Sequence, residues 1–133
     1  DASEALTEDE TVVIYQAPAS SISLILNPAP ASQGELNPFS IKKVRQALQY
    51  LIDREFVASN IYRGQALPMI THISPLDFDY LTLYQEILET PIQYDPELGS
   101  KMITEAMIEN GAELLDGTWH YKNHPIKIKF VIH

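Results

Sequence analysis

The chain of 133 residues contains no cysteine, which excludes disulfide bonds and a cysteine nucleophile but does not indicate a cellular compartment. No apolar run approaches the ~18 residues that a membrane-spanning helix requires. The sequence also lacks a glycine-rich phosphate loop and a Gly-x-Ser-x-Gly nucleophile turn. Because the cysteine nucleophile, the phosphate loop and the serine nucleophile turn are all missing, we expect a protein that is not an enzyme and has no catalytic residues.

Positive charge is scarce: 9 lysines and arginines face 18 aspartates and glutamates, giving a net charge of −9. Such a surface repels the phosphates of nucleic acids and anionic membranes, so we expect no nucleic-acid partner. Lys42, Lys43 and Arg45 form one basic cluster. The two lysines fall in the first turn of an expected helix, the unfavourable end for its dipole, and we interpret them as a solvated helix face.

Hydrophobic residues make up 45% of the chain, which is typical of a globular protein rather than a disordered one. A chain of this length corresponds to one ordinary domain, and it could bury about two thirds of its unfolded surface. Residues 1–10 are mostly acidic and small, so they predict a loose connector. Residues 11–133 predict a single domain, which is partial if the family resemblance described below holds.

The clearest pattern begins at Asn37-Pro38, a turn that ends any preceding strand. Ser40 is expected to cap a helix, and Asp53 to cap a second, short helix that stops at Gly64. The first helix has an apolar face at helical spacing. The face comprises Ile41, Val44, Ala47, Leu48, Leu51 and Ile52, and the short helix adds Phe56, Val57 and Ile61.

Other segments give a mixture of strands and helices. Val12–Tyr15 and Ile22–Leu26 predict strands, whereas residues 75–91 show neither period clearly. A third helix should begin at Asp95-Pro96 and end at Asn110-Gly111. A hairpin should turn at Lys122-Asn123 and continue as a half-buried strand, in which Ile126, Ile128, Phe130 and Ile132 face one way. The predicted fold class is α/β, an α+β mixed sheet with about three helices.

Several of these motifs, taken in order, resemble the family 5 extracellular solute-binding proteins of ABC importers, which capture peptides, nickel and other solutes. Over residues 12 to 133 the order and spacing agree. The motifs are Pro38-Phe39, Val44-Arg45-Gln46-Ala47-Leu48, Ile52-Asp53-Arg54-Glu55, Gly64-Gln65-Ala66-Leu67-Pro68, Tyr94-Asp95-Pro96-Glu97 and the hairpin from Asp116 to Ile128. Leu24-Ile25-Leu26-Asn27 is similar to a strand pattern that the family carries near the crossing between its lobes.

The resemblance implies a fragment from the leading part of the C-terminal lobe, lobe II of a periplasmic-binding-protein type II-like fold. Asp1 would then be an internal residue. The parent would capture a small solute, most often an oligopeptide, and deliver it to the membrane permease of an ABC transporter. It would work in the periplasm or outside the cell, associated with the membrane as a lipoprotein. A stand-alone acidic protein-interaction domain is the alternative.

Candidate site residues are few. His72, His120, His124 and His133 invite a metal hypothesis, but only His120 and His124 are expected to approach each other, so we predict no metal site and no cofactor. Paired carboxylates could serve acid–base chemistry, yet a solvated acidic loop explains them equally well. The carboxylates are Asp77, Asp79, Glu86 and Glu89. Trp119 and Tyr121 are expected to attach the hairpin to the sheet. The ligand-binding residues stay unknown, because the resemblance assigns none of them here.

Overall fold

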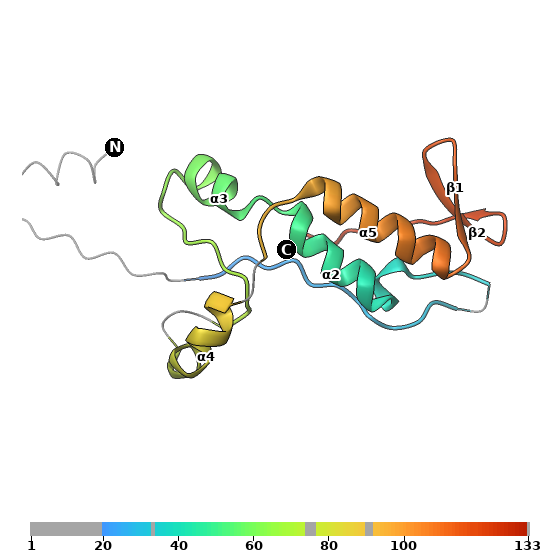
Figure 1. The fold of residues 1–133 in the computed structure, drawn as a ribbon. Helices are drawn as coiled ribbons and strands as arrows, with labels where there is room; N and C mark the ends of the chain where they lie inside the picture. Colours follow the sequence, from blue (N-terminus) through green and yellow to red (C-terminus); the bar gives the residue numbers. More distant parts are fainter. Residues whose placement is uncertain (1–19, 33, 74–76, 90–91, 133) are drawn as a thin grey trace, which may run out of the picture.

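The structure, a computed structural model, describes residues 20–32, 34–73, 77–89 and 92–132. The predicted connector 1–10, the predicted strand Val12–Tyr15 and His133 lie outside the described residues. Figure 1 shows the described chain as a helical body with a hairpin at one end and a separate helix away from it.

The elements follow one another as short helices, longer helices and then a small sheet. In chain order they are η1 (Pro38–Ser40), α2 (Lys42–Leu51), α3 (Arg54–Phe56), the π-helical turn η2 (Val57–Ile61), α4 (Phe78–Glu89), α5 (Pro96–Glu109), β1 (Ala112–Leu115), β2 (Thr118–Tyr121) and β3 (His124–Pro125). The α/β class is confirmed. The three described strands form one sheet in the order β1-β2-β3, and both pairings are antiparallel, whereas the sequence predicted a mixed sheet.

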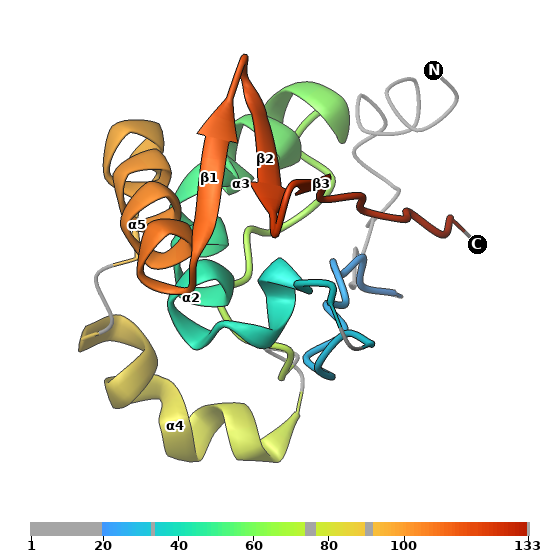
Figure 2. The ribbon, with the colours of Figure 1, turned by 90° about the vertical axis from the view of Figure 1, so that its right-hand side faces the viewer.

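Helices α2 and α5 lie side by side in both ribbon views (Figures 1 and 2). They run antiparallel, because the Asp95 amide at the start of α5 donates to the Tyr50 carbonyl near the end of α2 at 2.9 Å. Their close approach depends on Gly99. A Cβ atom at that position would lie 2.7 Å from Leu51 Cδ2 and 3.1 Å from the Ala47 carbonyl oxygen. Small residues at this contact therefore set the spacing of the helix pair.

The hydrophobic core lies where the helix pair meets the sheet. Its buried members are Val44, Ala106, Met107 and Ala112, with exposed fractions of 3% or less. Half-buried apolar side chains pack around them: Leu36, Phe39, Ile41, Ile103, Trp119 and Ile126. Trp119 and Tyr121 were predicted to attach the hairpin to the sheet; in the structure the hairpin is itself part of the described sheet, and Trp119 packs it against the core. Leu48, Leu51 and Ile52 are half-buried, because Val44 and Ala47 occupy the centre of the contact with α5.

Both hairpin turns use backbone in the left-handed region. Asp116 (φ 48°) and Gly117 (φ 77°) connect β1 to β2, and Lys122 (φ 49°) and Asn123 (φ 65°) connect β2 to β3. Two consecutive residues with positive φ are typical of the tight turns that match the twist of a hairpin. The predicted turn at Lys122-Asn123 is confirmed, while β1 was not predicted as a strand.

Three local predictions were wrong. Ser40 does not cap α2: its hydroxyl donates to the Asn37 carbonyl at 2.7 Å, and Ile41 stands at the cap position without a side-chain bond. Ile22–Leu26 forms no strand, because no described segment pairs with it. The last strand is limited to His124–Pro125, since Ile126 makes the final sheet bond and no backbone hydrogen bond joins the residues after it to another described segment.

Helix α4 forms where the sequence showed no clear period. In Figure 1 it stands apart from the α2–α5 pair. Two of its aromatic residues, Tyr80 and Tyr84, approach each other with ring centroids 6.0 Å apart, one helical turn along. Among the residues described, no helix combines the length and the apolarity needed to cross a membrane.

Candidate functional site

Asn37 organises the segment before the helices. Its amide group donates to the carbonyls of Asn27 (2.9 Å) and Ala29 (2.8 Å), while its side-chain oxygen accepts from the Phe39 amide (3.1 Å). Asn27 in turn accepts from the Ala29 amide at 3.0 Å. The sequence predicted Asn37 only as part of a turn. The Asn-Pro pair at both 27–28 and 37–38 was the available signal for this connection.

A shallow groove of about 350 Å³ lies next to this connection. One side is the loop held by Asn37, and the other is the extended chain after β3. Its lining residues are Asn27, Ala29, Pro30, Ala31, Ser32, Glu35, Asn37, Pro38, Phe39, Lys127, Ile128 and Lys129. The groove thus combines apolar walls with two lysines and one glutamate.

A second hollow, of about 220 Å³, separates the loop after η2 from α4. Its walls are mostly apolar, and Glu55 contributes a carboxylate at the rim. The residues that line it are Glu55, Pro68, Met69, Ile70, Thr71, Tyr80 and Ile87. It is smaller than the ~300–1,000 Å³ typical of ligand pockets, so it could hold only a group of side-chain size.

The Ile52-Asp53-Arg54-Glu55 motif joins two helices by satisfying free backbone groups at both. The Arg54 guanidinium donates to the Gln49 carbonyl in the last turn of α2 (3.0 Å), to the Ile52 carbonyl and to the Gln49 side chain. Asp53 accepts from the Phe56 amide at 2.8 Å and so caps α3, as predicted. Burial lowers the pKa of the Arg54 guanidinium from its ordinary value. This motif therefore shapes the junction between α2 and α3.

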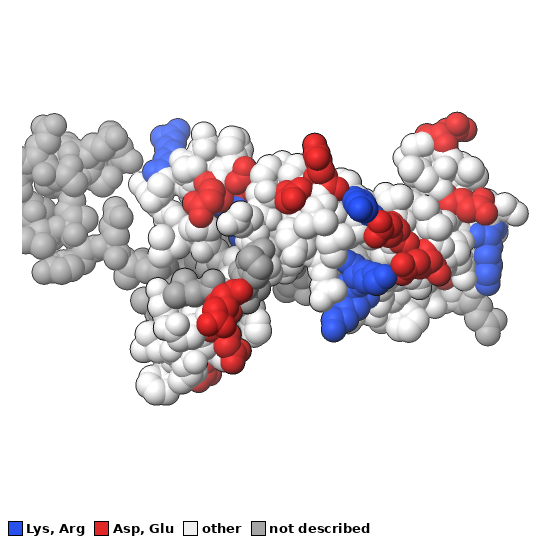
Figure 3. All heavy atoms as spheres, viewed as in Figure 1, with Lys and Arg blue, Asp and Glu red and all other residues white. Residues whose placement is uncertain are grey.

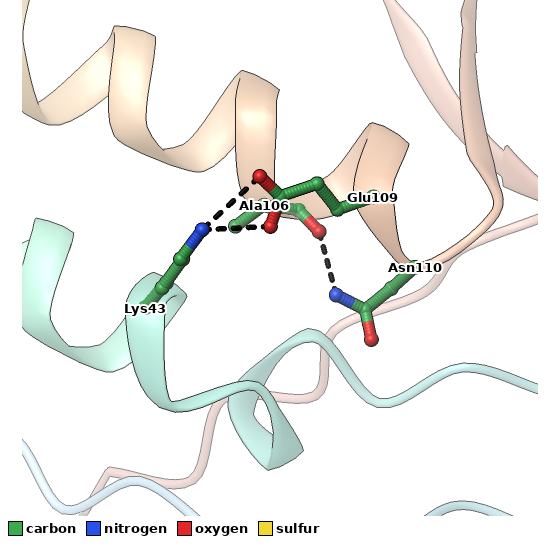
Figure 4. A network of polar contacts seen from close by, with 4 residues as sticks. All are labelled: Lys43, Ala106, Glu109 and Asn110. Carbon is green, nitrogen blue, oxygen red and sulfur yellow. Dashed lines mark hydrogen bonds and ion pairs between the residues drawn. The ribbon is translucent and has the colours of Figure 1, made fainter.

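The other motif residues have comparable structural roles. Asp95 caps α5 by accepting from the Leu98 amide at 2.9 Å, and Pro96 occupies the first helical position, both as predicted. At the opposite end the Asn110 side chain donates to the Ala106 carbonyl at 2.8 Å (Figure 4), and Gly111 follows with a positive φ. In the Val44–Leu48 motif, Arg45 donates to the carbonyls of η1 residues Phe39 (2.6 Å) and Ser40 (3.0 Å).

The basic cluster is more than a solvated helix face. Lys43 Nζ binds both carboxylate oxygens of Glu109, at 2.7 and 3.1 Å, and so connects the start of α2 to the end of α5 (Figure 4). The hydrogen bond to Glu109, and then its negative charge, raise the pKa of Lys43. Figure 3 shows this basic patch beside acidic side chains on α5, with further acidic patches along α4.

The histidine and carboxylate candidates lie in separate parts of the chain, with His120 and His124 in the hairpin and the carboxylates along and just before α4. Within residues 20–132 as far as they are described, no three metal-ligating side chains form a group that could hold an ion. His120 Nδ1 lies 3.0 Å from the Thr118 carbonyl, and His124 is paired with Tyr121 across the turn. Asp77, Asp79, Glu86 and Glu89 are all exposed, along and just before α4. No charged side chain is buried in the part of the chain that the structure describes.

Comparisons with known proteins agree with this arrangement. The sequence model described as "Bacterial extracellular solute-binding proteins, family 5 Middle" matches residues 1–130. Heme-binding protein A of Haemophilus influenzae is 34% identical over 79 residues, which are 59% of this chain and 14% of that protein. Nickel-binding protein NikA of Staphylococcus aureus is 31% identical over 90 residues, 68% of this chain and 15% of that protein. The chain thus spans about 15% of these relatives, and by its family match it belongs to the family 5 bacterial extracellular solute-binding proteins.

Proposed function

We propose that the protein is part of the substrate-binding subunit of an ABC importer. It captures a small solute for delivery to a membrane permease, and an oligopeptide is the solute that we propose first. The observation that carries this proposal is the family match over residues 1–130. The periplasm or cell exterior follows from the family's extracellular character. Attachment of the whole protein to the membrane, as a lipoprotein, is a further part of the proposal.

The contribution of these residues is one wall of a ligand cleft. The described contacts of the family motifs are structural: Asp95 caps a helix, and Arg54 donates to backbone carbonyls at the end of α2. The groove beside Asn37 reaches the size of a ligand pocket, but it is shallow and open on one side. A second wall, brought in by closure of two lobes, would enclose the solute.

The choice among solutes is the finer part of the proposal. The relatives are named for heme and nickel, whereas an oligopeptide is what the family resemblance implies most often. Titration calorimetry of the 133-residue chain with peptide pools, Ni²⁺ and heme should therefore show binding no tighter than about millimolar, because one wall alone preorganises few contacts. Micromolar binding of any of them would contradict the one-wall proposal.

The whole protein provides the decisive test. Small-angle scattering with and without a peptide pool should show a smaller radius of gyration for the liganded form, and mass spectrometry should recover the solute unchanged. If the protein proved cytosolic, or if it turned its ligand over, the transport proposal would fail and only the fold would stand. If the protein closed with nickel or heme but not with peptide, the transport proposal would stand and the oligopeptide would be replaced as the proposed solute.

A further inference from the structure

Helix α5 ends in an asparagine followed by a glycine, Asn110-Gly111. Asparagine is chemically labile, and a following glycine leaves its side-chain amide open to attack, because glycine has no side chain to obstruct the approach. The Gly111 amide loses its proton, its nitrogen bonds to Asn110 Cγ, and the side-chain nitrogen leaves as ammonia. Water then opens the resulting succinimide ring at either carbonyl and gives aspartate or isoaspartate. The reaction consumes water and releases ammonia, so it needs no other reactant.

The folded end of α5 holds every reacting group away from this path. The Asn110 side-chain nitrogen, which would have to leave, donates to the Ala106 carbonyl at 2.8 Å (Figure 4). The Gly111 amide, which would have to lose its proton, donates to the Ile108 carbonyl at 2.9 Å. Ring closure also requires Asn110 Cβ to eclipse the Gly111 nitrogen. With ψ at 14°, the backbone nitrogen of Asn110 takes that position instead.

We propose that Asn110 is a deamidation site controlled by the end of α5: it stays intact while the last turn is folded and is modified when that turn opens. The hydrogen bonds to Ala106 and Ile108 belong to the same turn, so one opening releases both the leaving group and the nucleophile. Helix ends open locally at a lower free energy than the core does. The inference concerns the chemistry of this chain and does not depend on its solute.

Deamidation would weaken the cap that had prevented it. An aspartate at position 110 has no N–H group for the Ala106 carbonyl. Its charge would lie beside Glu109 at the negative end of the helix dipole, and Lys43 already binds both carboxylate oxygens of Glu109. Isoaspartate would also lengthen the backbone between α5 and the buried Ala112 of β1. We therefore expect the modified chain to open more readily than the parent.

Peptide mapping by mass spectrometry, after incubation of the 133-residue chain in mildly alkaline buffer, measures the reaction. Trypsin releases residues 102–122, in which Asn110 is the one asparagine, and places Asn123 in the separate peptide 123–127. Deamidation raises the peptide mass by about 1 Da, because an amide becomes a carboxyl group. We expect the rate at Asn110 to be at least about tenfold higher in guanidinium chloride than in buffer. Equal rates, or no modification in the denaturant, would overturn the proposal.

A pair of variants tests whether the end of α5 controls the rate. Met107→Ala removes a side chain with an exposed fraction of 2% from the last turns of α5, and should raise the rate in buffer at least about tenfold. Leu81→Ala is the matched control, since it removes an apolar side chain that is 68% exposed on α4 and should leave the rate unchanged. In the denaturant the parent and both variants should react equally, because the Asn110-Gly111 pair is the same in each.

Each outcome of this comparison is decisive. If Met107→Ala failed to fold, its rate in buffer would reach the rate in the denaturant, which the proposal also requires. A Met107→Ala rate equal to that of the parent, or an equal acceleration by Leu81→Ala, would show that the end of α5 does not control Asn110.

The effect of the product is tested by Asn110→Asp. This variant should have a lower melting temperature than Asn123→Asp, which adds the same charge at the turn between β2 and β3, where aspartate is accepted. An Asn110→Asp variant as stable as Asn123→Asp would refute the expected weakening of the cap.

Discussion

Helices α4 and α5 are similar in length, 12 and 14 residues, but they differ in almost every contact. Helix α5 buries Gly99, Ala106 and Met107 against α2 and the sheet, and Asp95 caps it. Helix α4 has Phe78 exposed at 78% and Leu81 at 68%, and no described side chain of it is buried. Both helices carry enough apolar residues for a core. The difference shows that a helix contributes to the core when it has a neighbouring surface to pack against, and that its apolar composition alone is not sufficient.

The largest effect should come from Met107→Ala, which removes the largest fully buried side chain of the core. We expect a loss of about 2–5 kcal/mol in the free energy of unfolding, because a cavity is left beside Val44 and Ala112. Urea unfolding followed by circular dichroism measures it. The matched change on α4, Leu81→Ala, should stay within about 0.5 kcal/mol. Equal losses in the two variants would erase the distinction between the helices.

The next effect concerns the α2–α5 contact. Gly99→Val would place side-chain atoms against the Ala47 carbonyl and Leu51, so overpacking should cost about 1–3 kcal/mol. Ser100→Val, one position along the same helix and exposed, controls for the lower helix propensity of valine. Thermal unfolding of both variants should show a clear loss only at position 99. A Gly99→Val variant as stable as Ser100→Val would mean that the helices can separate without penalty.

A smaller effect is expected at the helix caps. Asp95→Ala removes the acceptor for the Leu98 amide at the start of α5 and should cost about 1 kcal/mol. Ser40→Ala should cost less, because Ser40 caps no helix here. Chemical unfolding that ranked the two variants in the opposite order would return Ser40 to the role that the sequence first suggested.

The smallest effect should come from Lys43→Met, since the ion pair with Glu109 is exposed on both sides. The pKa of Lys43 is raised above its ordinary value of 10.5, so its contribution is fully present below that pH and is lost as the pH rises through the folded-state pKa. Melting temperatures of parent and variant should therefore differ slightly at neutral pH and converge in strong alkali. A gap that widened with rising pH would contradict this sign.

Some of this fold could be predicted from local signals. Asp53, Asp95-Pro96, Asn110-Gly111 and Lys122-Asn123 each act on backbone groups within a few residues, so helix starts, stops and the hairpin turn followed from the sequence. The candidate site could not be predicted in the same way. The groove joins residues 27–39 to residues 127–129, and only the folded chain brings these stretches together.

The sequence by itself determined the family, the acidic surface and the start and end of α5, because caps and turns act on near neighbours along the chain. Tertiary structure alone decided three other features. Gly99 sets the approach of two helices, and Asn37 connects the loop at residues 27–29 to η1. Among the described residues, the alternating strand predicted at Ile126–Ile132 pairs only through the Ile126 amide, because a strand requires a neighbour to accept its hydrogen bonds and alternation cannot supply one.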